Sequence, residues 1–97
     1  MKKLADLVAA DFEACVGETV TVSFDGRVVA LTVDAVEVLG PGFERPEAFS
    51  VLFTGPDDAP LPQQMFGLGH ERLDDAEVFL VPIRRDERGF HYEAVFN

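Results

Sequence analysis

The sequence predicts a small all-β protein with a short N-terminal helix, folded as an antiparallel six-stranded β-barrel or sandwich. Apolar residues alternate with a period of two from residue 19 onwards, and turn signals separate these segments at fairly regular intervals. The chain has 97 residues, of which 47% are hydrophobic. That length supports one core and not two. We therefore expect one domain over residues 1–97, with a helical lid in 1–16 and a β core in 17–97.

The lid is predicted from the apolar spacing near the N-terminus. Leu4, Leu7 and Val8 stand at i, i+3 and i+4, which places them on one face of a helix over residues 3–10. A helix of about two turns is marginal alone. We expect it to pack over one open end of the β core.

The first hairpin is predicted from the turn Asp25-Gly26, because both positions tolerate the positive φ of a type I′ turn. This turn places Phe24 opposite Arg27. The remaining pairs are then Val22 with Val29, Val20 with Leu31, Thr21 with Ala30 and Thr19 with Thr32, which gives one apolar face. Beyond these pairs the apolar phase slips, so we expect a bulge at Asp34-Ala35.

Four more strands complete the predicted core. A strand over 48–54 ends at Gly55-Pro56, a proline-stiffened surface loop follows, and a weaker strand falls within 64–70. The closing hairpin is expected to pair Ile83 with Phe90 across a loop of 84–89. Its inner face would pair Val81 with Tyr92 and Phe79 with Ala94, and its partly solvated face Leu80 with Glu93 and Pro82 with His91.

Aromatic residues are expected to fill the interior. The set is Phe49, Phe53, Phe79, Phe90, Tyr92 and Phe96. A narrow barrel is filled by its own side chains, which favours core packing. The alternative is that these rings line a cavity for a small apolar ligand.

The charge balance bears on the choice of partner. Lys plus Arg number 8 and Asp plus Glu 18, which gives a net charge of −10. Phosphate backbones require clustered basic residues, so nucleic acid and anionic membranes are not expected to bind. Asp6 and Asp11 interrupt the N-terminal apolar stretch, so it does not read as a secretory signal. With Cys15 as the single cysteine, a cytoplasmic location is expected.

Catalytic and metal motifs are weak in this sequence. Cys15 could act as a nucleophile with His70 or His91 as its base, but its neighbours offer no positive charge, so we expect a buried structural cysteine. Zinc sites are usually marked by CxxC or HExxH spacing. No such spacing is found among His70, His91 and the acidic loop of Glu71, Asp74, Asp75 and Glu77. Gly67-Leu68-Gly69 lacks the third glycine of a nucleotide loop. The sequence therefore predicts no enzyme, metal or cofactor.

The segments FSVLFTGPDDAPLPQ, FLVPI and YEAVFN resemble a bacterial family known only as a domain of unknown function. That family carries FSLLFxGP, an LPQ loop and a closing FLVPh…G…YEAVFN, where h is hydrophobic. The matching residues are Phe49, Ser50, Leu52, Phe53, Gly55, Pro56, Leu61, Pro62, Gln63, Phe79 to Ile83, Gly89 and Tyr92 to Asn97. The family's genes often lie near phage-tail-like or tail-collar proteins, so the resemblance implies a role in assembly.

These observations lead us to expect a non-catalytic protein-interaction or assembly module, an accessory of a phage-tail-like particle. The expected partner is another protein, and a homodimer is a further possibility because an exposed strand edge can pair with a second copy. The LPQQ loop and the solvated face of the closing hairpin are the expected contact surface, through Gln63, Gln64, His91 and Glu93. The alternative function is binding of a small apolar ligand inside the barrel.

Overall fold

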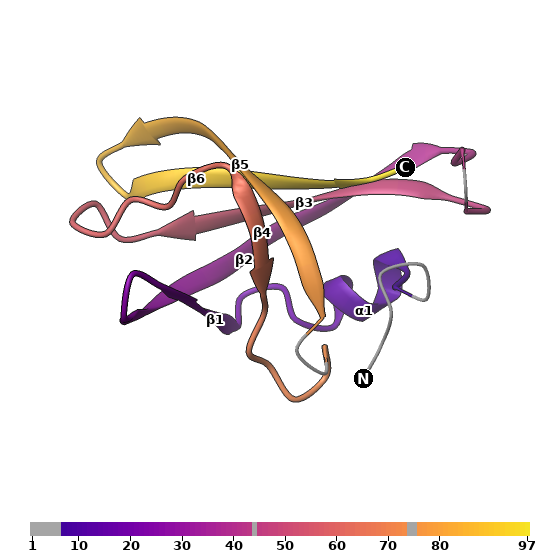
Figure 1. Cartoon of the computed structure of the whole chain (residues 1–97). Helices are drawn as coiled ribbons and strands as arrows, with labels where there is room; N and C mark the ends of the chain where they lie inside the picture. Colours follow the sequence, from indigo (N-terminus) through magenta and orange to yellow (C-terminus); the bar gives the residue numbers. More distant parts are fainter. Residues whose placement is uncertain (1–6, 44, 74–75) are drawn as a thin grey trace.

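A computed structural model of the chain (Figure 1) describes residues 7–43, 45–73 and 76–97. Its elements are α1 (Ala9–Glu13), β1 (Thr19–Phe24), β2 (Arg27–Gly40), β3 (Ala48–Gly55), β4 (Gln64–Gly67), β5 (Glu77–Asp86) and β6 (Gly89–Phe96). All neighbouring strands are antiparallel, in the order β1-β2-β3-β6-β5-β4. The sheet curls until Thr21 and Gly69 exchange backbone hydrogen bonds of 3.1 and 2.7 Å. The predicted fold class is confirmed, in its barrel form.

The first hairpin has the predicted register throughout. Phe24 lies opposite Arg27, and the other pairs follow as expected. The turn residues Asp25 and Gly26 have φ of 52° and 74°, as a type I′ turn requires. The apolar face is buried against the core through Val20, Val22, Val29 and Leu31. Turn chemistry and hydrophobic pattern therefore specify the same structure here.

Strand β2 continues past this hairpin into a projecting arm. The register shifts between Val33 and Ala35, which confirms the predicted bulge at Asp34. Strand β1 pairs with β2 only as far as Thr32, so beyond the bulge β2 pairs with β3 alone among the described residues. The β2–β3 arm extends past α1 on the side of the C-terminus (Figure 1). We call the side of Ala35–Gly40 that faces away from β3 the β2 edge.

The helix begins later than expected. Of the predicted 3–10 helix, Leu7 and Val8 precede α1, Ala9 and Ala10 form its first two residues, and residues 3–6 lie outside the described part of the chain. The Asp11 carboxylate accepts the Val8 N–H at 2.9 Å, which places the start of the helix after Val8. Phe12 is fully buried on the helix face that meets the core. No helix in the described ranges is long and apolar enough to cross a bilayer.

Aromatic packing joins α1 to the sheet. The Phe12 ring lies 6.0 Å from that of Phe49 and 5.3 Å from that of Phe96, and Phe49 and Phe96 stack at 4.5 Å. The Arg45 guanidinium lies 5.6 and 5.5 Å from the centroids of the two stacked rings, a cation–π arrangement. The N-terminal segment therefore covers this end of the core, as expected of a lid.

The predicted register of the closing hairpin is wrong. Asp86 pairs with Gly89, so the turn has two residues, and the ladder resumes at Pro82 opposite Tyr92 after a bulge at Ile83. Proline has no N–H to donate, which explains why the ladder breaks beside it. The consequences are that Val81 rather than Leu80 pairs with Glu93, Arg84 rather than Pro82 pairs with His91, and Phe90 pairs with Arg85.

This register also reverses the expected faces of β5. Val78 and Leu80 are fully buried, whereas Phe79 and Ile83 are 44% and 46% exposed. Of the predicted aromatic core, Phe49, Phe53, Tyr92 and Phe96 are buried and Phe90 is half-buried. The core also contains Phe12 and Phe66, which the predicted aromatic set omitted.

The proline-rich loop after β3 is packed more closely than expected of a surface loop. Ala59 and Leu61 are buried, and the Leu61 N–H donates to the Tyr92 hydroxyl at 3.0 Å. Burial of the phenol raises the pKa of Tyr92, so this hydroxyl stays protonated. The loop is thereby fastened to the centre of β6.

Candidate functional site

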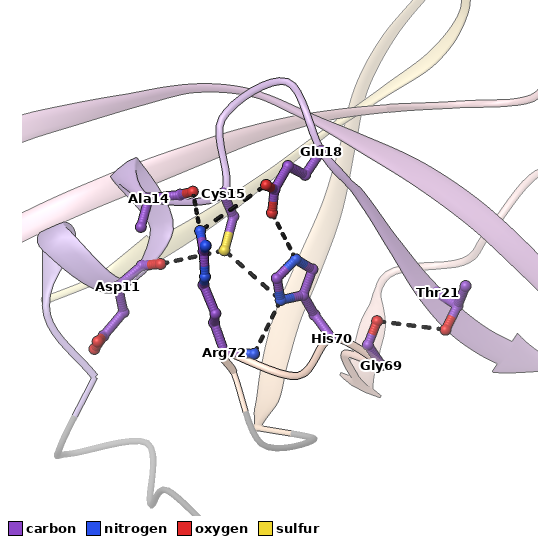
Figure 2. Close-up of polar contacts among 8 residues, drawn as sticks. All are labelled: Asp11, Ala14, Cys15, Glu18, Thr21, Gly69, His70 and Arg72. Atoms are coloured by element: carbon purple, nitrogen blue, oxygen red, sulfur yellow. Dashed lines mark hydrogen bonds and ion pairs between the residues drawn. The ribbon is translucent and has the colours of Figure 1, made fainter.

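Two polar clusters lie against the core, and each is built around one histidine. The first, the Cys15 cluster, comprises Cys15, Glu18, His70 and Arg72 (Figure 2). Cys15 and Glu18 come from the turn between α1 and β1, and the other two from the loop between β4 and β5. The backbone hydrogen bonds between Thr21 and Gly69 hold these two segments together.

The His70 ring bridges the cluster. Its Nδ1 faces the Cys15 sulfur at 3.8 Å, and its Nε2 lies 2.8 Å from Oε1 of Glu18. The backbone N–H of Arg72 donates to Nδ1 at 3.1 Å, so Nδ1 acts as an acceptor and the ring proton resides on Nε2. His70 therefore donates to the carboxylate from Nε2 and accepts the Arg72 N–H at Nδ1, the nitrogen that lies nearer the sulfur.

Arg72 also contacts the Cys15 cluster, from its solvent-exposed side. Its guanidinium donates to the Ala14 carbonyl at 2.8 Å and lies 3.9 Å from Oε2 of Glu18. Both partners of this guanidinium belong to the α1–β1 turn, so Arg72 ties the β4–β5 loop to that turn. The expected acidic loop is thus partly structural, although Asp74 and Asp75 lie outside the described residues.

The thiol itself is not activated. Cys15 is fully buried, and its pKa is raised, first by burial and then by the charge of Glu18. A nucleophilic cysteine needs a lowered pKa and partial exposure. The order thiol, imidazole, carboxylate is present, yet the environment keeps the thiol neutral, which agrees with the expected buried structural cysteine. His91 lies in a different cluster.

The second group, the His91 cluster, comprises Asp34, Thr54, Asp86 and His91. The Thr54 hydroxyl donates to the Asp34 carboxylate and lies 3.3 Å from Nδ1 of His91. Nε2 of His91 lies 2.8 Å from Oδ1 of Asp86. The hydrogen bond with His91, followed by one from the backbone N–H of Arg88, holds the pKa of Asp86 below its usual range. These four side chains join β2, β3, β5 and β6.

A surface cavity of about 230 Å³ opens beside the His91 cluster. It is lined by Asp34, Leu52, Ile83, Arg84, Arg88 and His91. Arg88 Nη2 lies 3.2 Å from Oδ1 of Asp34, so one basic side chain of the lining is already paired. The wall therefore carries both signs of charge together with the apolar side chains of Leu52 and Ile83.

The four predicted contact residues do not share one surface. Gln63 and Gln64 are exposed at the start of β4, and Glu93 is half-buried on β6 with β5 between them. His91 is only 5% exposed. The expectation of a solvated His91 came from the incorrect register of the closing hairpin.

Three exposed apolar residues lie on or beside the arm. Val38 and Leu39 on the β2 edge are 48% and 49% exposed, and Phe43, in the connection to β3, is 89% exposed. The slip in apolar phase predicted the bulge but did not reveal that β2 would leave its partner strand. A run of apolar residues beyond a bulge, followed by glycine and proline, was the available signal.

Fold and clusters together define a small antiparallel β-barrel, closed by one bridge and fastened by two imidazole–carboxylate groups. A family model described as "Domain of unknown function (DUF6916)" matches residues 7–96, and the chain belongs to this family. This agrees with the resemblance to a domain-of-unknown-function family. No curated protein and no solved structure matches the chain.

Proposed function

We propose that the protein is a non-catalytic interaction module whose partner adds a strand to the β2 edge. One observation carries this proposal. Strand β2 runs on to Gly40, but among the described residues nothing pairs with its outer edge from Ala35. An edge of this kind presents free backbone donors and acceptors, which an extended segment of another chain can pair with.

The side chains of the edge fit this mode of binding. Val38 and Leu39 are half-exposed, and neighbouring side chains of a strand point to opposite faces. An added strand would therefore have apolar contacts on both faces beside its backbone hydrogen bonds. Phe43 in the adjoining connection is almost fully exposed and supplies an aromatic anchor, a residue type that often dominates binding energy.

The charge of the protein indicates the chemistry of the partner. The net charge is −10, and Glu37 and Asp34 lie on or beside the β2 edge. An extended segment with apolar and basic residues is complementary to this surface and is attracted over long range. A second copy of this chain would bring a like charge, which disfavours a homodimer at low salt.

The biological setting that we propose is assembly of a phage-tail-like particle in the cytoplasm. The support is the resemblance of the C-terminal half to the family described above, together with a mode of binding that suits subunit assembly. Gln63, Gln64 and Glu93 are proposed as secondary contacts. The apolar-ligand alternative gains no support from the cavity beside the His91 cluster, because Phe49, Phe53 and Phe96 do not line it.

The experiment compares lysines placed at different points of one strand. Val38→Lys and Leu39→Lys introduce charge on the β2 edge, whereas Val28→Lys changes a valine that is 72% exposed where β2 still pairs with β1. Crosslinking in the native cell, followed by quantification of recovered partners, should show a loss of about tenfold for the two edge variants. Val28→Lys should recover partners like the unaltered chain.

Two outcomes would contradict the proposal. Equal recovery with Val28→Lys and Val38→Lys would remove the β2 edge as the contact. A stable dimer in light scattering that Val38→Lys dissociates would make the occupant a second copy. Alanine at Gln63, Gln64 and Glu93 tests the secondary contacts, and unchanged recovery would exclude them.

A further inference from the structure

We propose that Cys15, Glu18 and His70 form a binding site for a divalent transition metal, and that zinc is its natural occupant. One donor atom from each residue, namely the sulfur, a ring nitrogen and a carboxylate oxygen, lies within 4.8 Å of the other two. This inference is independent of the contact proposed at the β2 edge. The protein would then carry a metal centre between its helix turn and its β4–β5 loop.

The spacing of sulfur and nitrogen supports the assignment. Zinc bonds of about 2.3 Å to sulfur and 2.0 Å to nitrogen at a tetrahedral angle separate the two donors by about 3.5 Å. The observed distance between Sγ of Cys15 and Nδ1 of His70 is 3.8 Å. A shift of a few tenths of an ångström therefore brings both donors to bonding distance of one ion.

The three donors differ in mobility in a way that suits metal entry. Cys15 is fully buried and the His70 side chain is 10% exposed, so these two donors are held by packing. The Glu18 side chain is 45% exposed and can rotate. Its carboxylate now lies at Nε2 of His70, so it must rotate away from that nitrogen to reach an ion held by Nδ1 and the sulfur. Thiolate, imidazole and carboxylate together are a donor set that zinc accepts.

Binding replaces a proton on the sulfur by the metal. Cys15–SH and M²⁺ give the Cys15–S–M⁺ bond and one H⁺, which leaves to solvent past Glu18. The Nδ1 lone pair of His70, which now accepts the Arg72 N–H, bonds to the ion instead. Thiolate and carboxylate neutralise the two charges of the ion. The guanidinium of Arg72, 3.9 Å from Glu18, adds a positive charge that opposes binding.

Three protein donors leave one position of a tetrahedral ion open. Water fills this position in sites with three protein ligands, and a side chain from a partner could replace it. The open position faces the exposed side of Glu18, because the sulfur side is closed by the core. The site as described is thus of the open type and does not resemble a four-ligand structural centre.

The test uses Co²⁺ as a spectroscopic probe on the whole chain after removal of metal with a chelator. Cobalt should bind with one ion per chain and give a thiolate-to-cobalt charge-transfer absorption, which Zn²⁺ then displaces. An unbuffered titration should release about one proton per ion. Cys15→Ser should abolish the charge-transfer absorption, and His70→Gln and Glu18→Gln should weaken binding at least about tenfold.

Two further variants sharpen the test. Arg72→Gln removes the opposing charge and should tighten cobalt binding several-fold, whereas a purely structural cluster predicts no gain. Glu93→Gln, a half-buried acid on β6, is the matched control for Glu18→Gln and should bind cobalt like the unaltered chain. Because Glu18 is partly exposed, its variant should remain folded by circular dichroism even where Cys15→Ser does not.

Each result bears on the proposal. Absence of charge-transfer absorption in the unaltered chain would overturn it, as would equal cobalt affinity in Glu18→Gln and Glu93→Gln. Cobalt bound to Cys15→Ser with unchanged affinity would show that the acidic surface holds the ion without a defined site. One ion per chain, lost with Cys15 and weakened with Glu18, would establish the centre.

Discussion

The two histidine clusters have the same plan but opposite hydrogen-bond directions. In each, Nε2 faces a carboxylate at 2.8 Å, Glu18 for His70 and Asp86 for His91. In each, Nδ1 faces a small side chain, the thiol of Cys15 or the hydroxyl of Thr54. The comparison shows that an imidazole–carboxylate pair has no fixed role. The groups around Nδ1 decide what the ring can do.

The two clusters differ in which group donates the hydrogen bond at Nδ1 of the histidine. A backbone N–H of Arg72 donates to Nδ1 of His70, so this nitrogen is unprotonated and a metal could replace the N–H as the partner of its lone pair. The Thr54 hydroxyl gives its proton to Asp34, so its oxygen is left to accept from Nδ1 of His91. His91 thereby lies between Thr54 on β3 and Asp86 on β5 and serves as a cross-link between strands. Of the two rings, His70 is the one whose Nδ1 could bond to a metal.

The largest expected effect is a difference in stability between variants of the two histidines. His91→Ala leaves the side chains of Thr54 and Asp86 without the ring that lies between them and should lower the free energy of unfolding by about 3 kcal/mol. His70→Ala, at the more exposed cluster, should cost about 1 kcal/mol. Urea unfolding of both variants measures the difference. Equal losses would show that the two clusters support the fold alike.

The next effect concerns the partner at Nδ1. Thr54→Val keeps the shape of the side chain but removes the hydroxyl that links Asp34 to His91, and it should destabilise by about 2 kcal/mol. Cys15→Ala should cost about 1 kcal/mol, mainly through lost packing. Combining Thr54→Val with His91→Ala should cost less than the sum, because both remove one network. Additive losses would mean that the hydroxyl and the ring act separately.

A smaller effect is expected in acid. The pKa of Asp86 is held below its usual range by His91, so the folded state is favoured while this carboxyl is ionised. That stabilisation is present above about pH 4, the ordinary range of aspartate, and is lost as pH falls through the lowered folded pKa. Asp86→Asn should reduce the loss of stability measured between about pH 4 and pH 2. The carboxyl of Asp57, whose pKa is lowered by Arg85, should still contribute to the loss of stability as the pH falls.

The smallest effect is expected in alkali, at the other cluster. The raised pKa of Cys15 favours the folded state while the thiol is protonated. This stabilisation is complete below about pH 8.5, the ordinary value of a thiol, and is lost as pH rises towards the folded pKa. Cys15→Ala should flatten the stability profile between about pH 8 and pH 10. An unchanged slope there would assign the alkaline loss to Tyr92 instead.

The two hairpins show how far sequence alone predicts this fold. Asp25-Gly26 admits one turn type, so a single pair of residues set the register of β1 and β2 correctly. The segment 84–89 offers several possible turns. Pro82, which has no N–H to donate, marks a bulge or an edge, and the register does shift beside it, but the proline does not fix the pairing on either side. The incorrect register then placed His91 in solvent and Phe79 in the core. A strong turn signal is local, whereas a bulge depends on the whole sheet.

The candidate site was less predictable than the fold. Cys15 and His70 are separated by 55 residues, and Glu18 and His70 by 52, so no local spacing links them. Their meeting depends on the closure of the barrel, which periodicity cannot show. The buried state of Cys15 did follow from its neighbours. The convergence of its sulfur with an imidazole and a carboxylate required the three-dimensional path of the chain.

The bridge between Thr21 and Gly69 has a consequence for motion. Among the described residues, two backbone hydrogen bonds join β1 to the segment after β4, and a Cβ at residue 69 would collide with the Thr21 hydroxyl. The barrel is therefore closed at this point by a single pair of residues, whereas its neighbouring strands pair over several residues. The amide protons of these two residues should exchange with deuterium sooner than those of the β3–β6 ladder. Each such opening would part the two halves of the Cys15 cluster while most of the sheet stays paired.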